Sequence, residues 1–501
     1  MKRINKLLIA NRGEIALRII RSAREMGIKT VAIYSEADRN ALHVLQADQA
    51  VSVGPAAVAE SYLRSDRIVE TALRMDVDAI HPGYGFLSEN ADFARLVEDS
   101  GILFVGPSPS SIQTMGDKIA AKKAVEANGI PLIPGTNSSL PDLKEASKVA
   151  KSIGFPVLIK ASAGGGGKGM RIVWKEQEME EQLERAMSEA KAAFGNGAVF
   201  LEKYIANPRH IEIQVLGDQH GNLVHLFERE CSIQRRHQKI IEEAPSSLLT
   251  DRLREEMGQA AIKAAAACNY YGAGTVEFLV DEQQHFYFLE MNTRLQVEHP
   301  VTEMITGIDL VKEQIRIAEG HPLSFTQSDL TIQGHAFEVR VYAEDANTGF
   351  LPDTGKLVTY LPPSGPGIRV DDGYYQGMEV AVHYDPMIAK LITHAKDRKA
   401  AIQKMIRALE EYKIAGVKNT IDYCRTIFEH PKFQEGALST RFIEAEMQTR
   451  EAEEPLKSNR EAAALLAAYL WSNNHPPQVS SLAEPSSEAI NNWKKRRSGW
   501  S

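Results

Sequence analysis

The sequence predicts an α/β protein with an N-terminal doubly wound domain, a small lid joined to a larger body, and a C-terminal antiparallel, β-rich subdomain. Residues 7–34 read as strand, helix, strand, a glycine-rich loop lies between two β-type runs, and several alternating strands follow between 210 and 342. Parallel βαβ units belong to doubly wound domains, whereas alternating strands are typical of antiparallel sheets. A chain of 501 residues is too long for one core, so about two to four domains are expected.

Composition limits the possible partners. The net charge of −8 argues against nucleic acid as the main partner, because nucleic-acid binding usually requires an excess of basic residues. The three cysteines lie far apart without a CxxC pair, so neither a disulfide framework nor a zinc site is expected. The short apolar run after Met1 reads as a buried first strand, and no stretch is long enough to span a membrane. We therefore expect a soluble, cytoplasmic protein that binds no membrane.

The first βαβ unit resembles the start of a dinucleotide-binding fold. Glu36 and Asp38 follow its second strand, where a ribose-binding acid would stand. The turn before the helix, however, has one glycine, Gly13, where the dinucleotide fingerprint needs three, so NAD binding is disfavoured. The segment HPGYGFLSEN (81–90) follows a later strand, and its glycines suit a ligand-approaching loop and a plain strand-to-helix turn equally well. A strand at 103–106 completes this domain.

The glycine-rich loop AGGGGKG (163–169) is predicted to be the tip of a hairpin, since β-type residues flank it on both sides. It is not a phosphate-binding Walker loop, because Gly169 rather than Ser or Thr follows Lys168. One alternative is a purely structural hairpin. The other is a flap over phosphates, which the free backbone N–H groups and the nearby Lys160 and Lys168 favour. A charged helix at 176–194 and a strand at 198–205 follow.

Residues 290–298 alternate strictly between polar and other side chains. As a strand, this segment would direct five polar groups to one face: Glu290, Asn292, Arg294, Gln296 and Glu298. An ordinary solvated strand face fits the pattern equally well. A helix with Arg294 and Glu298 as a surface pair is disfavoured by the β-branched Thr293 and Val297 and by Pro300.

Glu277 interrupts an otherwise apolar strand, and a hairpin should place it opposite or diagonal to Glu290. Two carboxylates with the Asn292 amide oxygen form an all-oxygen set of the kind that magnesium prefers. The basic run RRHQK (235–239) is either a solvated stretch or an anion site. A further alternating strand places Glu338 and Arg340 on one face.

Several motifs together resemble biotin carboxylase of the ATP-grasp superfamily over residues 1 to about 447: NRGEIA (11–16), HPGYGFLSEN, KASAGGGGKGMR (160–171), RRHQK and EMNTRLQVEHPVTEMITG (290–307). The resemblance implies an N-terminal (pre-ATP-grasp) α/β domain at 1–113, an ATP-grasp domain at 114–330 with a mobile lid at about 134–204, and a biotin carboxylase C-terminal domain at 331–447. Residues 448–501 are expected to form a helix and then a disordered tail.

The resemblance also implies roles for individual residues. Nucleotide contacts are implied for Lys118, Lys160, Gly166, Gly167, Glu202, Lys203, Tyr204, Ile205, His210, Gln234, His237, Glu277 and Glu290. Magnesium ligands are implied at Glu277, Glu290 and Asn292, bicarbonate ligands at Lys239, Arg294, Gln296, Val297 and Glu298, and biotin contacts at Arg340, Tyr84 and Gly85. Catalysis would fall to Lys239, Arg294, Glu298 and Arg340, with Glu298 as general base.

The implied activity is that of a ligase that carboxylates biotin with ATP, bicarbonate and two magnesium (or manganese) ions, through carboxyphosphate. The only Met-Lys pair is Met1-Lys2, so no Ala-Met-Lys-Met acceptor is present and no carboxyltransferase segment is recognised. We therefore expect a free-standing, homodimeric subunit of an acetyl-CoA or acyl-CoA carboxylase of fatty acid metabolism, whose partners are a biotin carboxyl carrier protein and carboxyltransferase subunits. Two alternatives are another ATP-grasp ligase, of the purine-pathway or carbamoyl-phosphate type, and a non-catalytic nucleotide-binding regulator.

Overall fold

The computed structural model describes residues 2–136, 140, 143–161, 170–194, 197–236, 238–447 and 465–466. Backbone contacts divide the chain into one unit of residues 1–448 and a second of residues 449–501. Of the second unit only Leu465 and Leu466 are described, so the helix and tail expected after residue 447 lie otherwise outside the described residues.

A five-stranded parallel sheet forms the N-terminal domain, in the order β3-β2-β1-β4-β5. Its strands are β1 (Lys6–Ile9), β2 (Lys29–Ser35), β3 (Gln49–Gly54), β4 (Ala79–His81) and β5 (Leu103–Phe104), and its helices are α1 (Gly13–Glu25), α2 (Leu42–Gln46), α3 (Ser65–Arg74), α4 (Ala91–Asp99) and α5 (Pro109–Gly116). Leu7 and Ile9 of β1 pack in one apolar cluster and Leu8 in another. Both faces of the sheet are therefore covered, which confirms the doubly wound prediction.

The strand order reverses between β1 and β4, and in open α/β sheets ligands bind outside the carboxyl ends of the strands at such a point. Asn11 follows β1, and the HPGYG segment follows β4. The Asn11 side-chain amide donates to the carbonyl oxygens of Pro82 (2.7 Å) and Tyr84 (2.8 Å). Gly83 has a φ of +64°, and a Cβ there would lie 3.0 Å from Asn11 Nδ2. Asn11 and the glycine thus fix the loop that carries Tyr84.

The carboxylate of Asp38, which follows β2, is hydrogen-bonded by side chains of the same domain. Arg12 donates to both oxygens of Asp38 (2.6 and 2.7 Å), and the Tyr62 hydroxyl donates to it at 2.5 Å. Asp38 is 2% exposed. This agrees with the sequence argument against NAD binding.

A single eight-stranded antiparallel sheet connects the body with the C-terminal region, in the order β13-β12-β9-β10-β11-β14-β21-β19. These strands are β13 (Phe286–Asn292), β12 (Gly272–Val280), β9 (Arg209–Gly217), β10 (Leu223–Arg235), β11 (Gln238–Ala244), β14 (His335–Tyr342), β21 (Met387–Ala395) and β19 (Ile368–Asp372). Ile211, Ile213 and Phe278 point to the apolar core beneath α9 (Asp251–Ala266). Glu212 and Glu277, one residue away in the pleat, therefore lie on the opposite face.

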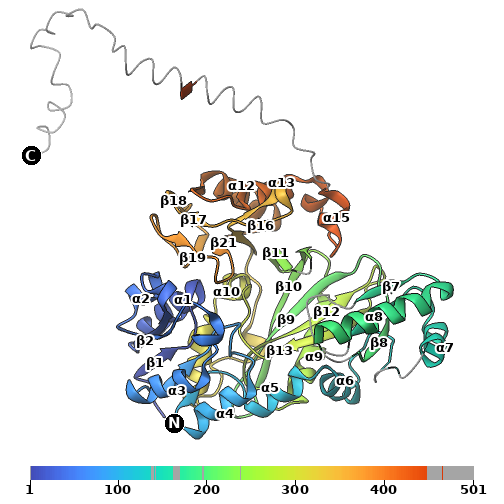
Figure 1. The fold of residues 1–501 in the computed structure, drawn as a ribbon, viewed down its shortest axis with the longest axis horizontal. Helices are drawn as coiled ribbons and strands as arrows, with labels where there is room; N and C mark the ends of the chain where they lie inside the picture. Colours follow the sequence, from blue (N-terminus) through green and yellow to red (C-terminus); the bar gives the residue numbers. More distant parts are fainter. Residues whose placement is uncertain are drawn as a thin grey trace, which may run out of the picture. The chain divides into compact units, whose positions relative to one another are not determined.

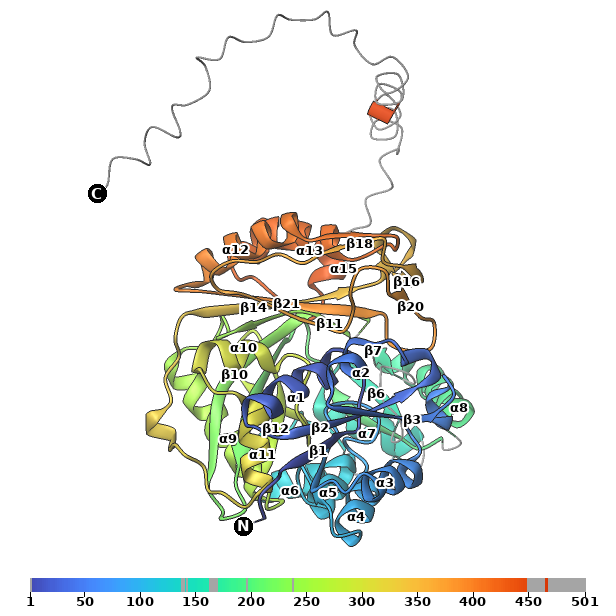
Figure 2. The same ribbon diagram turned by 90° about the vertical axis from the view of Figure 1, so that its left-hand side faces the viewer.

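Helices cover the C-terminal end of this sheet. Met405 of α12 (Arg398–Glu411) and Phe428 of α13 (Ile421–Glu429) pack with Val339 of β14 and Leu391 of β21, and Figure 2 shows both helices along the top of these strands. Outside the lid, the remaining α-helices are α6 (Lys118–Ala127), α10 (His299–Thr306), α11 (Leu310–Ala318), α14 (Pro431–Gln434) and α15 (Phe442–Glu446). Small two-stranded sheets pair β15 (Glu344–Asp345) with β16 (Leu351–Pro352), β17 (Gly355–Lys356) with β20 (Glu379–Val380), and β18 (Thr359–Leu361) with β22 (Lys413–Ala415).

The lid is a separate small layer with its own core. Its antiparallel sheet has the order β7-β6-β8, from β6 (Val157–Ala161), β7 (Arg171–Val173) and β8 (Val199–Lys203), with α7 (Leu143–Ile153) and α8 (Met179–Phe194) beside it. The antiparallel β6–β7 pair confirms the predicted hairpin. Figure 1 shows the lid and the N-terminal domain on opposite sides of β9, β10 and β12.

One predicted strand limit is wrong. The strand predicted over 290–298 ends at Asn292, because the next amide, of Thr293, donates to the Glu89 carboxylate (3.0 Å) instead of a neighbouring strand. Pro300 stands in the first turn of α10, where a missing N–H costs nothing. Of the RRHQK run, Arg235 ends β10, Arg236 lies in a turn, and Gln238 begins β11.

We predict that Gly373→Ala destabilises the contact between the C-terminal region and α1. A Cβ at this position would lie 2.8 Å from the backbone N of Glu14, and overpacking of this kind costs about 1–3 kcal/mol. Denaturant unfolding measures the loss. Gly116→Ala is the control, because a Cβ there meets nothing within 4 Å; equal stability of the two variants would contradict the prediction.

Candidate active site

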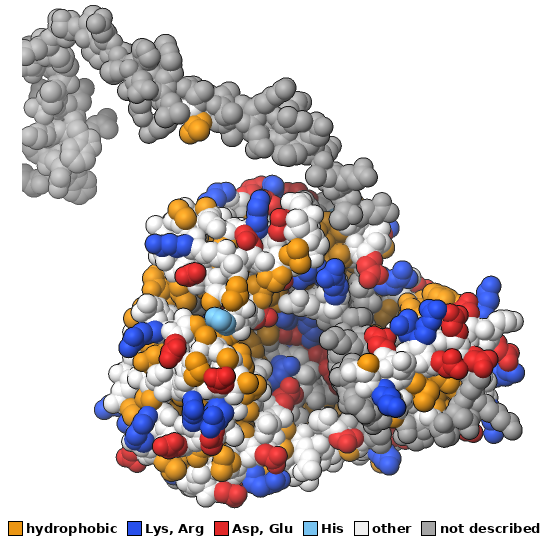
Figure 3. Space-filling view, viewed as in Figure 1, with side chains coloured by type: hydrophobic (Ala, Val, Ile, Leu, Met, Phe, Trp, Pro, Cys, Tyr) orange, Lys and Arg blue, Asp and Glu red, His pale blue; other side chains and the backbone are white. Residues whose placement is uncertain are grey.

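Charged side chains gather on the face of the large sheet that is turned away from α9. They come from four strands of this sheet: Glu212 from β9, Glu277 from β12, Lys239 and Glu242 from β11, and Arg340 from β14. Figure 3 shows the molecule hollowed near the middle of this view, with Lys or Arg and Asp or Glu side chains inside the hollow.

Lys239 is the centre of this group. Its Nζ lies 2.6 Å from Glu212 Oε2, 2.9 Å from Glu277 Oε1 and 2.6 Å from Glu298 Oε1. Glu212 and Glu277 are direct cross-strand partners, so their carboxylates would repel each other without a cation. Burial raises the pKa of Glu298, but Lys239 and Arg340 outweigh burial and hold that pKa well below its usual range. Glu298 is therefore ionised at neutral pH.

Glu277 and Glu290 face each other directly across β12 and β13, as the sequence predicted. Desolvation by the neighbouring strands, followed by the charge of Glu277, raises the pKa of Glu290, although part of this residue is exposed to solvent. Asn292 donates its amide to Glu277 Oε1 at 3.0 Å, and His210 Nε2 lies 2.9 Å from Glu277 Oε2. Two opposed carboxylates, one with a raised pKa, and a neighbouring amide oxygen fit a hard divalent cation such as magnesium.

The loop 293–298 has neither helical nor strand structure and is held by side chains. Arg294 Nε donates to Glu89 Oε2 at 2.8 Å, and Arg294 Nη2 donates to Asn292 Oδ1 at 3.2 Å. Gln296 Nε2 donates to Glu277 Oε1 (2.9 Å), and the Val297 carbonyl accepts from Lys390 (2.8 Å). The structure thus brings Gln296 and Glu298 into the Lys239 cluster, while Arg294 contacts Glu89 at the edge.

Arg340 links one further carboxylate, that of Glu242, to this cluster. It donates to Glu242 Oε1 at 2.6 Å and to Glu298 Oε2 at 3.0 Å. Burial raises the pKa of Glu242 to about 7, although Arg340 acts to lower it. Tyr84 donates its hydroxyl to Glu14, and Lys390 lies 5.9 Å from the centre of the Tyr84 ring. Gly85, with a φ of +68°, follows Tyr84 in the same loop.

A second group of predicted residues lies at the lid. Glu202 of β8 accepts from Lys160 of β6 at 2.5 Å and from Lys122 of α6. Burial raises the pKa of Glu202, but the two ammonium groups outweigh it and lower the pKa. Lys203 donates to the carbonyl oxygens of Gly154 (2.8 Å) and Phe155 (3.0 Å), so its ammonium is directed to the lid backbone.

The remaining predicted residues lie at the end of the lid, in β10 and at the start of α6. The Tyr204 ring packs edge-on against Trp174 at 5.6 Å, and Ile205 directly follows Tyr204. Gln234 donates to the carbonyl oxygen of Cys231 at 2.8 Å. Lys118 begins α6, and its charge acts to lower the pKa of Glu290. Gly166, Gly167 and His237 lie outside the described residues.

Sequence reasoning missed several residues that hold the cluster together. Arg229 is fully buried and donates to Glu212 (2.5 Å), Gln296 (2.9 Å) and three further side-chain oxygens, those of Gln214, Thr275 and Thr302. Glu89, Glu242 and Lys390 were missed too. The available signal was a charged residue at an inward position of an otherwise apolar strand, as at Arg229 and Lys390.

One further group of possible metal ligands, His210, Glu212 and Cys231, has its ligand atoms within 4.8 Å of one another. Both oxygens of Glu212 already accept from Arg229 and Lys239. These two cations stand where a metal would bind to this carboxylate. The group is therefore better described as part of the Lys239 cluster.

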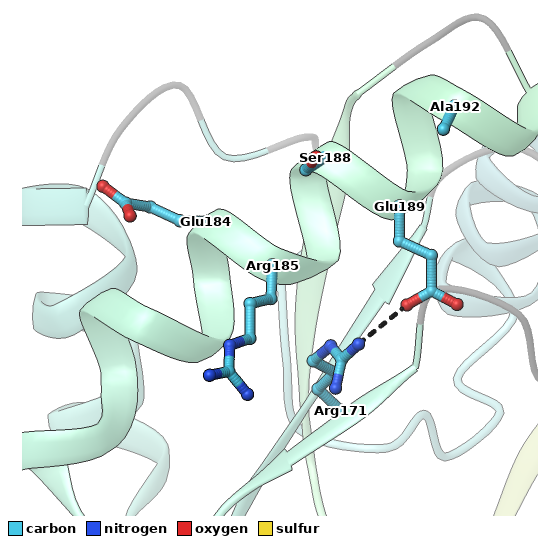
Figure 4. Close-up of a pocket in the computed structure, with 6 residues that line it drawn as sticks. All are labelled: Arg171, Glu184, Arg185, Ser188, Glu189 and Ala192. Atoms are coloured by element: carbon cyan, nitrogen blue, oxygen red, sulfur yellow. Dashed lines mark hydrogen bonds and ion pairs between the residues drawn. The ribbon is translucent and has the colours of Figure 1, made fainter.

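A recess of about 450 Å³ on the lid lies apart from this cluster. Figure 4 shows its lining between β7 and α8: Arg171, Glu184, Arg185, Ser188, Glu189 and Ala192. Arg171 pairs with Glu189 at 3.1 Å, and Arg185 pairs with Glu181 at 2.5 Å. The two arginines of this recess are thus paired at the surface, and the candidate active site is the cluster on the large sheet.

In the part of the chain that the structure describes, no helix is both long and apolar enough to cross a membrane.

Family models match three consecutive parts of the chain. Residues 3–112 match the N-terminal domain of biotin carboxylase and residues 338–445 match its C-terminal domain. Residues 117–326 match the ATP-binding domain of the carbamoyl-phosphate synthase L chain. Because the flanking models both describe biotin carboxylase, they favour this family over a carbamoyl-phosphate-type ligase.

Individual proteins agree with these models. Biotin carboxylase of a Nostoc species is 53% identical over 442 residues, covering 88% of this chain and 99% of that protein. The biotin carboxylase domain dimer of Hydrogenobacter thermophilus 2-oxoglutarate carboxylase, solved with MgADP, ADP and bicarbonate, matches with a TM-score of 0.85 and 50% identity over 91% of this chain and 100% of that one. The biotin carboxylase subunit of pyruvate carboxylase, another solved structure, matches with a TM-score of 0.80 and 50% identity over 90% of this chain and 100% of that one. The chain therefore belongs to the biotin carboxylase family of ATP-grasp enzymes, which carboxylate biotin in an ATP-dependent reaction.

Proposed function

We propose that this protein carboxylates biotin attached to a separate carrier protein, with bicarbonate as the carbon source and carboxyphosphate as the intermediate. The observation that supports this most directly is the contact of one carboxylate, Glu298, with both Lys239 (2.6 Å) and Arg340 (3.0 Å). This contact supports a role for Glu298 as the base, with Lys239 and Arg340 as cations beside it and the opposed Glu277 and Glu290 near them.

The magnesium ligands in this proposal are Glu277, Glu290 and Asn292. Magnesium, or manganese in its place, would neutralise phosphate charge when bound there. The ATP ligands are the lid and sheet residues that include Lys118, Lys160, Gly166, Gly167, His210, Gln234 and His237, with the segment from Glu202 to Ile205 against the base. Paired to Glu202 and lying on the lid strand β6, Lys160 can move with the lid toward the phosphates.

Bicarbonate binds between Lys239, Arg294, Gln296, Val297 and Glu298. Its oxygen attacks the γ-phosphorus of ATP, ADP leaves, and Glu298 accepts the bicarbonate proton. Glu298 is ready for this role because Lys239 and Arg340 keep it ionised. Arg294 is a planar fork suited to a carboxylate-shaped anion, and it must leave Glu89 to bind one.

Biotin accepts the carboxyl group beside Arg340, Tyr84 and Gly85. Carboxyphosphate releases carbon dioxide and phosphate, and the released phosphate takes the ureido proton of biotin. Arg340 stabilises the enolate-like oxygen that results, and the deprotonated ureido nitrogen then bonds to the carbon of carbon dioxide. Arg340 is held ready for this by two carboxylates, Glu242 and Glu298. A non-catalytic regulator would not need this combination of base and cations.

The domain division at 1–113, 114–330 (lid 134–204) and 331–447 is part of the proposal. The lid's separate apolar core and the family-model limits near 112, 326 and 338 support it. We further propose a cytoplasmic homodimer that works with a biotin carboxyl carrier protein and carboxyltransferase subunits of an acyl-CoA carboxylase. Two relatives support this: the Hydrogenobacter biotin carboxylase domain is a dimer, and the pyruvate carboxylase relative is one subunit of a larger enzyme.

The activity itself is the first test. We expect the purified protein to release ADP from ATP only when bicarbonate and magnesium are present, and free biotin should stimulate this release. Chromatography of the nucleotides and capture of labelled carboxybiotin from labelled bicarbonate measure the two products. ATP cleavage that neither bicarbonate nor biotin changes would favour a different ATP-grasp reaction.

A second test separates catalysis from binding. Glu298→Gln removes the base but keeps the shape of the side chain, so we expect turnover to fall by about 10²–10⁴-fold. The dissociation constant of MgATP, measured by calorimetry, should stay the same. Glu256→Gln makes the same change on the exposed face of α9, where Glu256 contacts Arg252, and should leave turnover unchanged. Full activity in Glu298→Gln would refute the assignment of the base.

A further inference from the structure

We propose that Lys390 is a positioning residue that holds the bicarbonate loop (293–298) and the Tyr84 loop in one fixed arrangement. This inference rests on the proposed function, because it assigns the two loops to the two substrates. Lys390 lies on β21 and none of its side chain is exposed. Lysine is almost never fully buried unless its charge is paired, so its partners identify its role.

The first partner is the backbone of the bicarbonate loop. Lys390 Nζ lies 2.8 Å from the Val297 carbonyl oxygen. Val297 stands between Gln296 and Glu298, in a stretch without regular structure, so no strand or helix fixes its peptide groups. The hydrogen bond from Lys390 of β21 fixes the carbonyl group of Val297, the residue directly before Glu298.

The second partner leads to the Tyr84 loop. Lys390 Nζ lies 3.2 Å from Glu14 Oε1, in the first turn of α1, and the same oxygen accepts the hydroxyl of Tyr84. The other oxygen of Glu14 is buried and has no hydrogen-bond partner among the described residues. Lys390, Glu14 and Tyr84 therefore form one chain of contacts from the bicarbonate side to the biotin side.

The cross-strand register shows that Lys390 destabilises the sheet unless a carboxylate compensates its charge. Lys390 pairs directly with Arg340 on β14, and like charges so placed destabilise a sheet. The nearest alternative counter-charge on that face, Glu338, has neither oxygen hydrogen-bonded within the described chain, and burial raises its pKa well above the usual value. Asp371, the partner of Lys390 on β19, is bound to both ends of the Arg369 guanidinium. Glu14 is thus the carboxylate that contacts Lys390.

Two variants separate the two arms of this contact chain. Lys390→Met keeps the length of the side chain but loses both contacts, so we expect kcat for bicarbonate-dependent ATP cleavage and for biotin carboxylation each to fall by about 10–100-fold, as small misplacements of reacting groups do. Glu14→Gln removes the negative charge from the arm to Tyr84 and leaves the contact of Lys390 with Val297 in place. It should reduce kcat/KM for biotin and leave ATP cleavage with bicarbonate alone at the wild-type rate.

The double variant tests whether the residues act as one unit. If they do, Glu14→Gln should add nothing to the loss of biotin carboxylation that Lys390→Met already causes. Purely additive losses would overturn the proposal. So would a Lys390→Met enzyme with wild-type kinetics, or one that loses MgATP affinity in the same proportion as turnover, since that result indicates general damage.

A control measures the effect of losing another paired cation from the C-terminal domain. Arg398 of α12 is partly buried, contacts Glu243 of β11 at 2.7 Å, and makes no contact with a residue of the proposed site among the described residues. Arg398→Met should lower the unfolding free energy but leave all kinetic constants unchanged. If Lys390→Met does not fold, the Glu14→Gln kinetics decide the proposal alone, because unchanged kcat/KM for biotin would refute it.

Hydrogen exchange gives a readout that does not depend on activity. In Glu14→Gln we expect faster amide exchange in the peptide that contains Tyr84, and in Lys390→Met faster exchange in that peptide and in the one covering 293–298. Arg398→Met should change neither. Wild-type exchange in both peptides of Lys390→Met would overturn the inference, and absence of biotin-dependent turnover in the wild-type protein would refute the proposed function instead.

Discussion

The ammonium of Lys239, surrounded by three carboxylates, is the interaction on which the site depends. Glu212 and Glu277 are cross-strand partners, and Glu298 approaches them from a loop, so these three carboxylates would repel one another without a cation between them. Replacing such a buried network by apolar side chains often makes a protein more stable. The charges are therefore better explained by chemistry than by folding.

One continuous sheet gives this network its geometry. The strands of this sheet carry apolar residues such as Ile211 and Phe278 on the α9 face and acidic and basic residues on the other. The pleat, together with an irregularity in the β10–β11 pairing, sets the row of functional groups. Because the sheet crosses from the body into the C-terminal region, the proposed metal ligands and Arg340 belong to one rigid frame. The lid has a separate apolar core of its own.

Short-range patterns predicted much of the fold and part of the site. The periodicity of residues 7–34 predicted the doubly wound domain, and the interrupted apolar strand at Glu277 predicted the carboxylate opposite Glu290. The end of β13 could not be predicted, because it depends on Glu89, which is 204 positions away from Thr293 in the sequence. Arg229 and Lys390 were missed for the same reason: a single charge in an apolar strand shows burial, but only the tertiary structure shows its partner.

In the proposed reaction, the electrostatics of Glu298 connect proton transfer with substrate binding. In the free protein Lys239 and Arg340 lower its pKa, and a carboxylate with a lowered pKa is a weak base. A bound bicarbonate shares these two cations and adds its own negative charge, and both effects raise the pKa of Glu298 toward that of its substrate. The base thus becomes effective only when its anion is in place. An arrangement of two cations on one carboxylate gives this coupling without any conformational change, provided that the loop bearing Glu298 stays fixed against the sheet.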